Sequence, residues 1–276
     1  MSDHAIEGLA PAGLWDYFAQ LSRIPRESGN EKAAQGFVVK VAKSLGLEYQ
    51  QDRAGHIVVR KPASAGLEGK PMVCLQGHLD MVCVKRPGKK HDFAKDPITL
   101  VRDGGWITAD GTTLGADNGI AVATNLAIMA DRSLVHGPLE FLFTYDEERG
   151  LAGARTLDGS MLKSRILVNL DSEDEGVLTV GCAGGADSVA SWPLALDAVP
   201  KGLVALEVRV TGLKGGHSGV EIHTQRGNAI KLLTRVLRQV EPVRANVGDG
   251  AEVRPPIGIH PPVVVVRPEE PVLGVR

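Results

Sequence analysis

The sequence has few of the features that mark disulfide-bonded or membrane proteins. It contains three cysteines in 276 residues, Cys74, Cys83 and Cys182, an odd number without paired spacing. This argues against a disulfide framework and favours a reducing compartment. No apolar run approaches the roughly 20 residues that span a bilayer, and no basic stretch followed by an apolar one stands near the N-terminus. We therefore expect a cytoplasmic location and no membrane partner.

The sequence also lacks an excess of charge of either sign. Its 31 Lys and Arg residues nearly balance 33 Asp and Glu residues, giving a net charge of −2. A chain with this balance has no strong positive field to attract nucleic acid, so we expect no nucleic-acid partner. The content of 43% hydrophobic and 23% charged residues is typical of a globular protein. The length allows one large domain or two smaller ones.

What the first two thirds of the chain do contain is an alternation of apolar strands and amphipathic helices. This alternation predicts an α/β domain with a largely parallel sheet. Predicted strands cover residues 56–60, 72–76, 139–145 and 166–170, and predicted helices cover 12–22, 31–45 and 120–130, with a further helix between the last two strands.

Residues that could bind a metal follow three of these strands. His78 and Asp80 come after strand 72–76, Glu147 and Glu148 come after strand 139–145, and Asp171 comes after strand 166–170. In α/β sheets, ligands bind beyond the carboxyl ends of the strands. Each residue alone also has a structural interpretation as a solvated charge. Together they predict a hydrolytic zinc site at one edge of the sheet.

Asp117 stands at the start of the predicted helix 120–130 and has two interpretations. It occupies the position of a helix N-cap. Taken alone, Asp117 is best explained as such a cap, but together with the other carboxylates and the histidine it could serve a pair of zinc ions about 3.5–4 Å apart. The residues alone leave both interpretations open.

The pattern changes after Gly184-Gly185. Residues 203–210 alternate as a strand does, residues 215–219 form a glycine-rich loop around His217, and residues 228–240 have the period of an amphipathic helix. The last 36 residues carry seven of the 16 prolines. We therefore predict three regions, listed here in chain order: an N-terminal catalytic part at 1–185, part of a second domain at 186–240, and a poorly ordered Pro/Val-rich tail at 241–276.

Several segments resemble the motifs of the co-catalytic zinc peptidase family, most of all its aminoacyl-histidine dipeptidases. The similarity runs from about residue 12 to 240. It implies a mixed, largely parallel sheet with flanking helices, plus the start of an α+β lid domain. The implied reaction is hydrolysis of dipeptides, Xaa-His above all, by a hydroxide bridging two zinc ions. The matching segments are 77–82, 111–119, 145–148, 169–173 and 215–219.

The resemblance also implies roles for the metal ligands. His78 and Asp171 would hold one zinc, Glu148 would hold the other, and Asp117 would bridge both, with a peptide bond to Asn118 that is often cis in such proteins. Manganese or cobalt could replace zinc.

Three further roles are implied by the resemblance. Asp80 would orient the metal-binding histidine, and Glu147 would act as the general base. His217, in the lid, would bind substrate or stabilise the developing oxyanion. A loop histidine between flexible glycines is the alternative interpretation of His217.

The sequence departs from the family pattern near its end. Family members are longer, and a segment after the lid supplies a final histidine ligand to the second zinc. His223 and His260 lie in the wrong context for that role. We therefore expect a second zinc site one protein ligand short, with weak or absent activity. A frameshift or premature stop near residue 240 is our hypothesis for the departure.

Other interpretations remain beside the dipeptidase. One is a related aminoacylase or deacetylase, since substrate pockets lie partly beyond the matching segments. The other is a non-catalytic relict of such an enzyme that still associates. A homodimer is possible in either case.

Overall fold

The computed structural model describes residues 4–172, 174, 176–181, 189, 191, 193, 208–215 and 221–240. The chain divides into two compact units, residues 1–184 and 185–276. The predicted catalytic part corresponds closely to the first unit, while its assignment as a domain stays a prediction.

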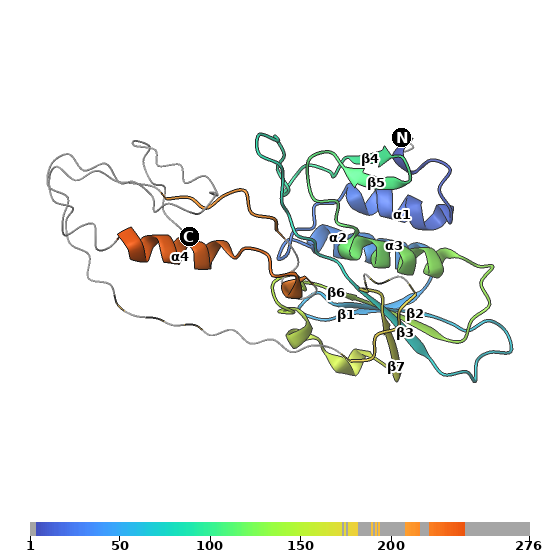
Figure 1. The fold of residues 1–276 in the computed structure, drawn as a ribbon. Coiled ribbons are helices and arrows are strands. Elements are labelled where there is room, and N and C mark those ends of the chain that lie inside the picture. The colour runs from blue at the N-terminus through green and yellow to red at the C-terminus, as the bar shows by residue number, and fades with distance from the viewer. Residues whose placement is uncertain are drawn as a thin grey trace, which may run out of the picture. The chain divides into compact units, whose positions relative to one another are not determined.

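A mixed five-stranded sheet forms the centre of the first unit (Figure 1). β3 pairs in parallel with both β6 and β7, while β2 is antiparallel to β6 and to β1. Four of the five strands therefore run in one direction. The strands, in sheet order, are β1 (Glu48–Gln51), β2 (Ile57–Lys61), β6 (Leu139–Thr144), β3 (Val73–His78) and β7 (Ile166–Asn169).

Three helices cover one face of this sheet (Figure 1). Phe141 and Phe143 of β6 point to this face, where they pack with Val38 and Leu126 in the main core. Burial of each such side chain contributes about 1.5–3 kcal/mol. The predicted class, an α/β protein with helices flanking a sheet, is confirmed. The helices are α1 (Ala12–Ser22), α2 (Lys32–Ser44) and α3 (Ala116–Ala130), preceded by the short 3-10 helix η1 (His4–Ile6).

The opposite face of the sheet is covered by the segment between β6 and β7. We predicted an α-helix there, and that prediction is wrong. The segment forms two 3-10 turns, η2 (Ala154–Thr156) and η3 (Gly159–Met161). Glycines interrupt the segment, and the Asp158 side chain accepts a hydrogen bond from Ser160 N and begins the second turn. Such local bonds compete with helix formation.

Three short strands were not predicted. β1 is polar, and β4 (Leu100–Asp103) and β5 (Trp106–Ala109) form a separate hairpin. None of the three forms the kind of apolar run that predicted β6 and β7.

In the second unit, the structure describes η4 (Ile222–Thr224) and α4 (Ala229–Val240). The predicted helix 228–240 is confirmed. Residues 208–210 of the predicted strand 203–210 have no strand conformation, and its other residues lie outside the described part, as do His217 and the tail 241–276. Among the described residues, no helix is both long enough and apolar enough to span a membrane.

Candidate metal centre

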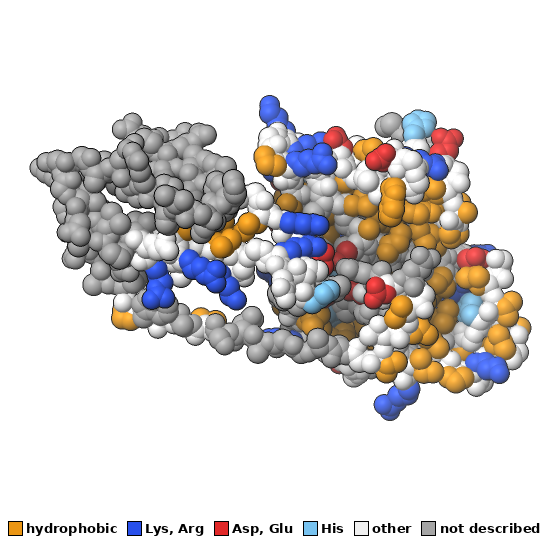
Figure 2. Space-filling model, viewed as in Figure 1, with side chains coloured by type: hydrophobic (Ala, Val, Ile, Leu, Met, Phe, Trp, Pro, Cys, Tyr) orange, Lys and Arg blue, Asp and Glu red, His pale blue; other side chains and the backbone are white. Residues whose placement is uncertain are grey.

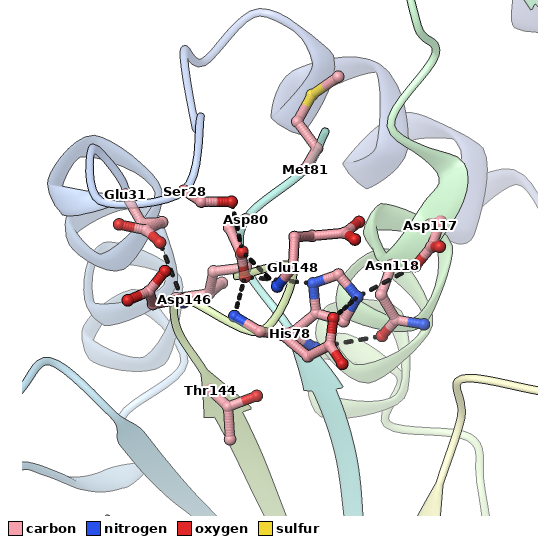
Figure 3. Close-up of polar contacts among 12 residues, drawn as sticks. Ser28, Glu31, His78, Asp80, Met81, Asp117, Asn118, Thr144, Asp146 and Glu148 are labelled. Atoms are coloured by element: carbon pink, nitrogen blue, oxygen red, sulfur yellow. Dashed lines mark hydrogen bonds and ion pairs between the residues drawn. The ribbon is translucent and has the colours of Figure 1, made fainter. Parts of the chain in front are cut away.

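The sheet topology brings the predicted site residues to one edge of the first unit. β3 lies between β6 and β7, and all three strands run in parallel. Their carboxyl ends therefore meet. His78 is the last residue of β3, the acidic pair follows β6, and Asp171 follows β7. Asp117, on the first turn of α3, faces the same point (Figure 3).

His78 lies at the centre of this cluster and is 1% exposed. Its Nε2 atom donates to Oδ1 of Asp117 at 3.0 Å. The same nitrogen lies 3.6 Å from Oδ2 of Asp171 and 3.8 Å from Oε2 of Glu147. Donor atoms of His78, Asp117 and Glu148 all lie within 4.8 Å of one another. One imidazole and four carboxylates thus converge.

Asp80 supports the cluster from behind. Its Oδ1 lies 3.2 Å from Nδ1 of His78. The two carboxylate oxygens also accept the backbone N–H groups of Glu147 and Glu148, both at 3.1 Å, and the hydroxyl of Ser28 at 2.8 Å. Asp80 therefore holds the acidic turn as well as the imidazole (Figure 3). The sequence predicted only its contact with the histidine.

Asn118 connects the other two segments of the site. Its Oδ1 accepts the backbone N–H of His78 at 3.2 Å, and its Nδ2 donates to Oδ1 of Asp171 at 2.5 Å. The peptide bond between Asp117 and Asn118 is cis, as the resemblance implied. Gly77 makes room for this arrangement, because a Cβ atom there would lie 2.6 Å from the Asn118 Oδ1 atom.

The two interpretations of Asp117 can now be separated. Its backbone angles are not helical, at φ −77° and ψ 113°, and its side chain is turned toward His78. The helix proper begins after it. The interpretation as a plain N-cap is therefore not supported.

Two residues just before α2, the half-buried Ser28 and the buried Glu31, also belong to this site and were not among the predicted site residues. Glu31 makes no side-chain cap to α2. Its Oε1 instead accepts the backbone N–H groups of Asp146 and Gly29, both at 3.0 Å. Asp146 in turn pairs with Arg149. No signal in the sequence identified them, because their position opposite the end of β3 follows only from the fold.

Glu31, Asp80 and Asp146 form a second group of buried carboxylates whose oxygens lie within 4.8 Å. The described contacts account for this group without an ion, because backbone N–H groups or the Arg149 guanidinium already donate to each of its three carboxylates. Hydrogen bonds of this kind stabilise buried carboxylates. The group acts as a support for the acidic turn.

The pKa of His78 reflects the negative charge around it. Burial alone would lower this pKa, but the hydrogen bond with Asp117 and the contact with Asp80 raise it to about 10. Burial alone would also raise the pKa of Asp80, yet its hydrogen bonds hold that pKa well below its usual range. In the metal-free protein, a protonated His78 therefore supplies the positive charge that the carboxylates need.

The remaining carboxylates repel one another. Burial raises the pKa of Asp171 to about 6, and the charges of Asp117 and Glu147 add to the rise. Burial also raises the pKa of Glu147 and of Glu148. A divalent cation among these oxygens would offset the repulsion. The donor set, an imidazole with carboxylates, suits zinc and also manganese or cobalt.

The fold and this group of donors define the class of the chain: an α/β protein with a candidate metal site where parallel strands end. The family follows from comparison with known proteins. Residues 74–266 match the profile of peptidase family M20/M25/M40, and the chain belongs to that family.

Two relatives support the assignment. The chain is 50% identical over 229 residues to the cytosol non-specific dipeptidase of Escherichia coli (strain K12), covering 83% of this chain and 47% of that protein. It is 45% identical, with a TM-score of 0.65, to the crystal structure of an aminoacylhistidine dipeptidase from Vibrio alginolyticus, covering 84% and 47% of the two chains. The chain thus spans about half the length of these relatives.

Proposed function

We propose that this chain carries most of the catalytic residues of a zinc-dependent dipeptidase. The observation that carries the proposal is the convergence of His78 with four carboxylates at one edge of the sheet. Membership of the peptidase family and the names of the two relatives support hydrolysis of dipeptides. The name of the second relative supports Xaa-His as the substrate class. The name of the first relative supports a cytosolic location.

In this proposal, His78 and Asp171 would hold one zinc, Glu148 would hold the second, and Asp117 would contribute to both. When bound, the zinc ions would polarise the scissile carbonyl and make the attacking water more acidic. Among the residues that the structure describes, Asp117 and Glu148 remain for the second ion, fewer than the three protein ligands usual for catalytic zinc. We therefore expect one tight and one weak zinc site.

Glu147 acts as the general base. Its side chain is 29% exposed, so water can reach it, and burial raises its pKa toward the value that suits proton transfer. Glu147 takes the proton from the attacking water and delivers it to the leaving amine. Asp80 holds Glu147 by its backbone N–H and keeps the imidazole of His78 in place. His217 would contact substrate, as the resemblance implies.

Zinc titration and dipeptide hydrolysis test the proposal together. We expect the purified chain to bind zinc, and to hydrolyse an Xaa-His dipeptide slowly and only in the absence of chelator. Glu147→Gln should keep zinc binding and lose hydrolysis, while Glu68→Gln, on an exposed loop, should change neither.

Other outcomes would favour the alternatives. Hydrolysis of an N-acyl amino acid in place of the dipeptide would indicate an aminoacylase or deacetylase. Bound zinc without turnover, together with concentration-dependent dimerisation, would indicate a non-catalytic protein. Absence of zinc binding would overturn the proposal.

A further inference from the structure

Arg26 is a buried arginine that touches two of the segments that carry the candidate ligands. It lies between α1 and α2 and is 2% exposed. One Nη atom donates to the backbone carbonyl oxygens of Leu79 at 2.9 Å and Asp80 at 3.0 Å, just after His78. The other Nη donates to the carbonyl oxygen of Gly115, two residues before Asp117.

The backbone of the same segment adds to this contact. Met81 N donates to the Arg26 carbonyl oxygen at 3.1 Å, and Glu27 forms a parallel bridge with Met81. The segment after α1 therefore runs beside the end of β3. The guanidinium extends from that segment to the start of α3.

Two glycines make room for the guanidinium. A Cβ atom on Gly119 would lie 2.6 Å from the Arg26 Nη2 atom, and one on Gly115 would lie 2.4 Å from it. Gly115 also has a φ of 72°, which favours glycine. Gly119 lies within α3 at an ordinary φ, where alanine would otherwise be the better helix former. The close approach of Arg26 thus explains a glycine in the first turns of α3.

The charge of Arg26 is maintained although it is buried. Burial lowers its pKa to about 10, against the opposing effect of Asp80, Asp117 and Glu148, so the group stays protonated near neutral pH. Its Nε atom has no hydrogen-bond partner among the described residues. A buried charge with an unpaired donor is costly to stability. The guanidinium offsets part of this cost by donating to the backbone carbonyl oxygens of Leu79, Asp80 and Gly115.

We propose that Arg26 is a positioning residue of the metal centre, whose planar guanidinium sets the spacing between the end of β3, with His78, and the turn that carries Asp117. The inference rests on the proposed function, since it concerns the same site. Arginine suits this role because its planar, rigidly arranged donors reach several carbonyl oxygens at fixed angles, which the single ammonium of lysine cannot do.

Three variants of the full chain test the proposal. Arg26→Lys keeps the charge and loses the planar donors. Gly119→Ala keeps the arginine in the sequence, but the added Cβ atom would displace its guanidinium. Gly36→Ala, in α2, is the matched control, because a Cβ atom there meets nothing within 4 Å.

Zinc affinity, measured by competition with a chromophoric chelator, is the first measurement. We expect both test variants to bind zinc roughly 10- to 100-fold more weakly, as is typical when groups that orient metal ligands are changed. The control should match the parent chain. Parent-like affinity in either test variant would overturn the proposal. Urea unfolding of the metal-free proteins separates positioning from folding. An affinity loss that only follows a loss of stability would also overturn it.

A second measurement does not depend on zinc. In the metal-free protein, the imidazole N–H of His78 that donates to Asp117 should give its own proton resonance in NMR. We expect this resonance to shift or disappear in Gly119→Ala and to stay in Gly36→Ala. An unchanged resonance in Gly119→Ala would overturn the positioning role. If the parent chain binds no zinc, the proposed function fails, and this resonance still decides the role of Arg26.

Discussion

β6 and β7 are the two parallel neighbours of β3, and they differ in how deeply they are buried. Five of the six residues of β6 are buried, whereas all four residues of β7 are exposed. Figure 2 shows hydrophobic side chains at the surface around the position that β7 has in Figure 1. Yet both strands lead into candidate metal ligands. The strands on the two sides of the site are therefore packed to different extents.

The difference continues into the turns. The turn after β6 is fixed by buried carboxylates, since Glu31 and Asp80 accept its backbone N–H groups. The residue after β7, Asp171, is held by two asparagines: Asn118 donates to its side chain, and Asn169 accepts its backbone N–H at 3.0 Å. We infer that β6 sets the rigid half of the site and that β7 supplies the adjustable half.

The largest expected effect is on the free energy of unfolding, and it tests the difference in burial between β6 and β7. Phe141→Ala removes a fully buried ring from the main core and should lower the free energy of unfolding by about 3–5 kcal/mol. Leu167→Ala, on β7, is 52% exposed and should cost less than about 1 kcal/mol. Urea unfolding monitored by circular dichroism measures both. Equal losses would contradict the contrast between the strands.

A second prediction concerns the buried carboxylate at the start of β6. Glu140 accepts hydrogen bonds from Arg60 Nε at 3.0 Å and from the backbone N–H groups of Lys163 and Ser164. Glu140→Gln should be less stable by about 1.5–3 kcal/mol at neutral pH, because Arg60 loses its buried charged partner and keeps only the exposed one, Glu48. Unfolding of Gln76→Ala, on the neighbouring strand, provides a comparison with a less buried polar residue.

The pH dependence of the same variant gives a sharper test. Burial alone would raise the pKa of Glu140, but its hydrogen bonds from Ser164, Lys163 and Arg60 lower it overall. A lowered folded-state pKa adds stability above the unfolded pKa, and this stability is lost as the pH falls through the folded pKa. The stability difference between parent and Glu140→Gln should therefore shrink as the solution is acidified. A difference that stays constant would contradict the argument.

Sequence pattern predicted the first unit well where a single physical signal dominates. The strands β3 and β6 are long apolar runs, and the parallel topology that joins their ends follows from the alternation with helices. The residues that support the candidate ligands through hydrogen bonds were harder to predict. Arg26, Ser28 and Glu31 reach the site from far away in the sequence, and their neighbours in the chain give no sign of what they will contact.

The third prediction tests the adjustable half of the site. Asn118→Ala removes the hydrogen bonds to His78 N and to the Asp171 carboxylate, so the zinc affinity should fall roughly 10- to 100-fold. Asn125→Ala is the matched control in the same helix, because its amide bonds, among the residues that the structure describes, only to the Leu75 carbonyl oxygen. The control is expected to change stability more than zinc affinity. Equal affinity losses in the two variants would show that the effect is general to α3.

The smallest effect is expected on the rigid half. Ser28→Ala removes one of several hydrogen bonds to Asp80, and the backbone N–H groups of Glu147 and Glu148 remain. The loss of one such bond corresponds to about 1 kcal/mol, or roughly a fivefold change in zinc affinity. Ser44→Ala is the control, since that hydroxyl bonds within α2 to Val41 O. A loss with Ser28→Ala as large as that with Asn118→Ala would mean that the turn after β6 depends on each bond separately. In that case, the presence of several hydrogen bonds to Asp80 would not explain the rigidity of this half of the site.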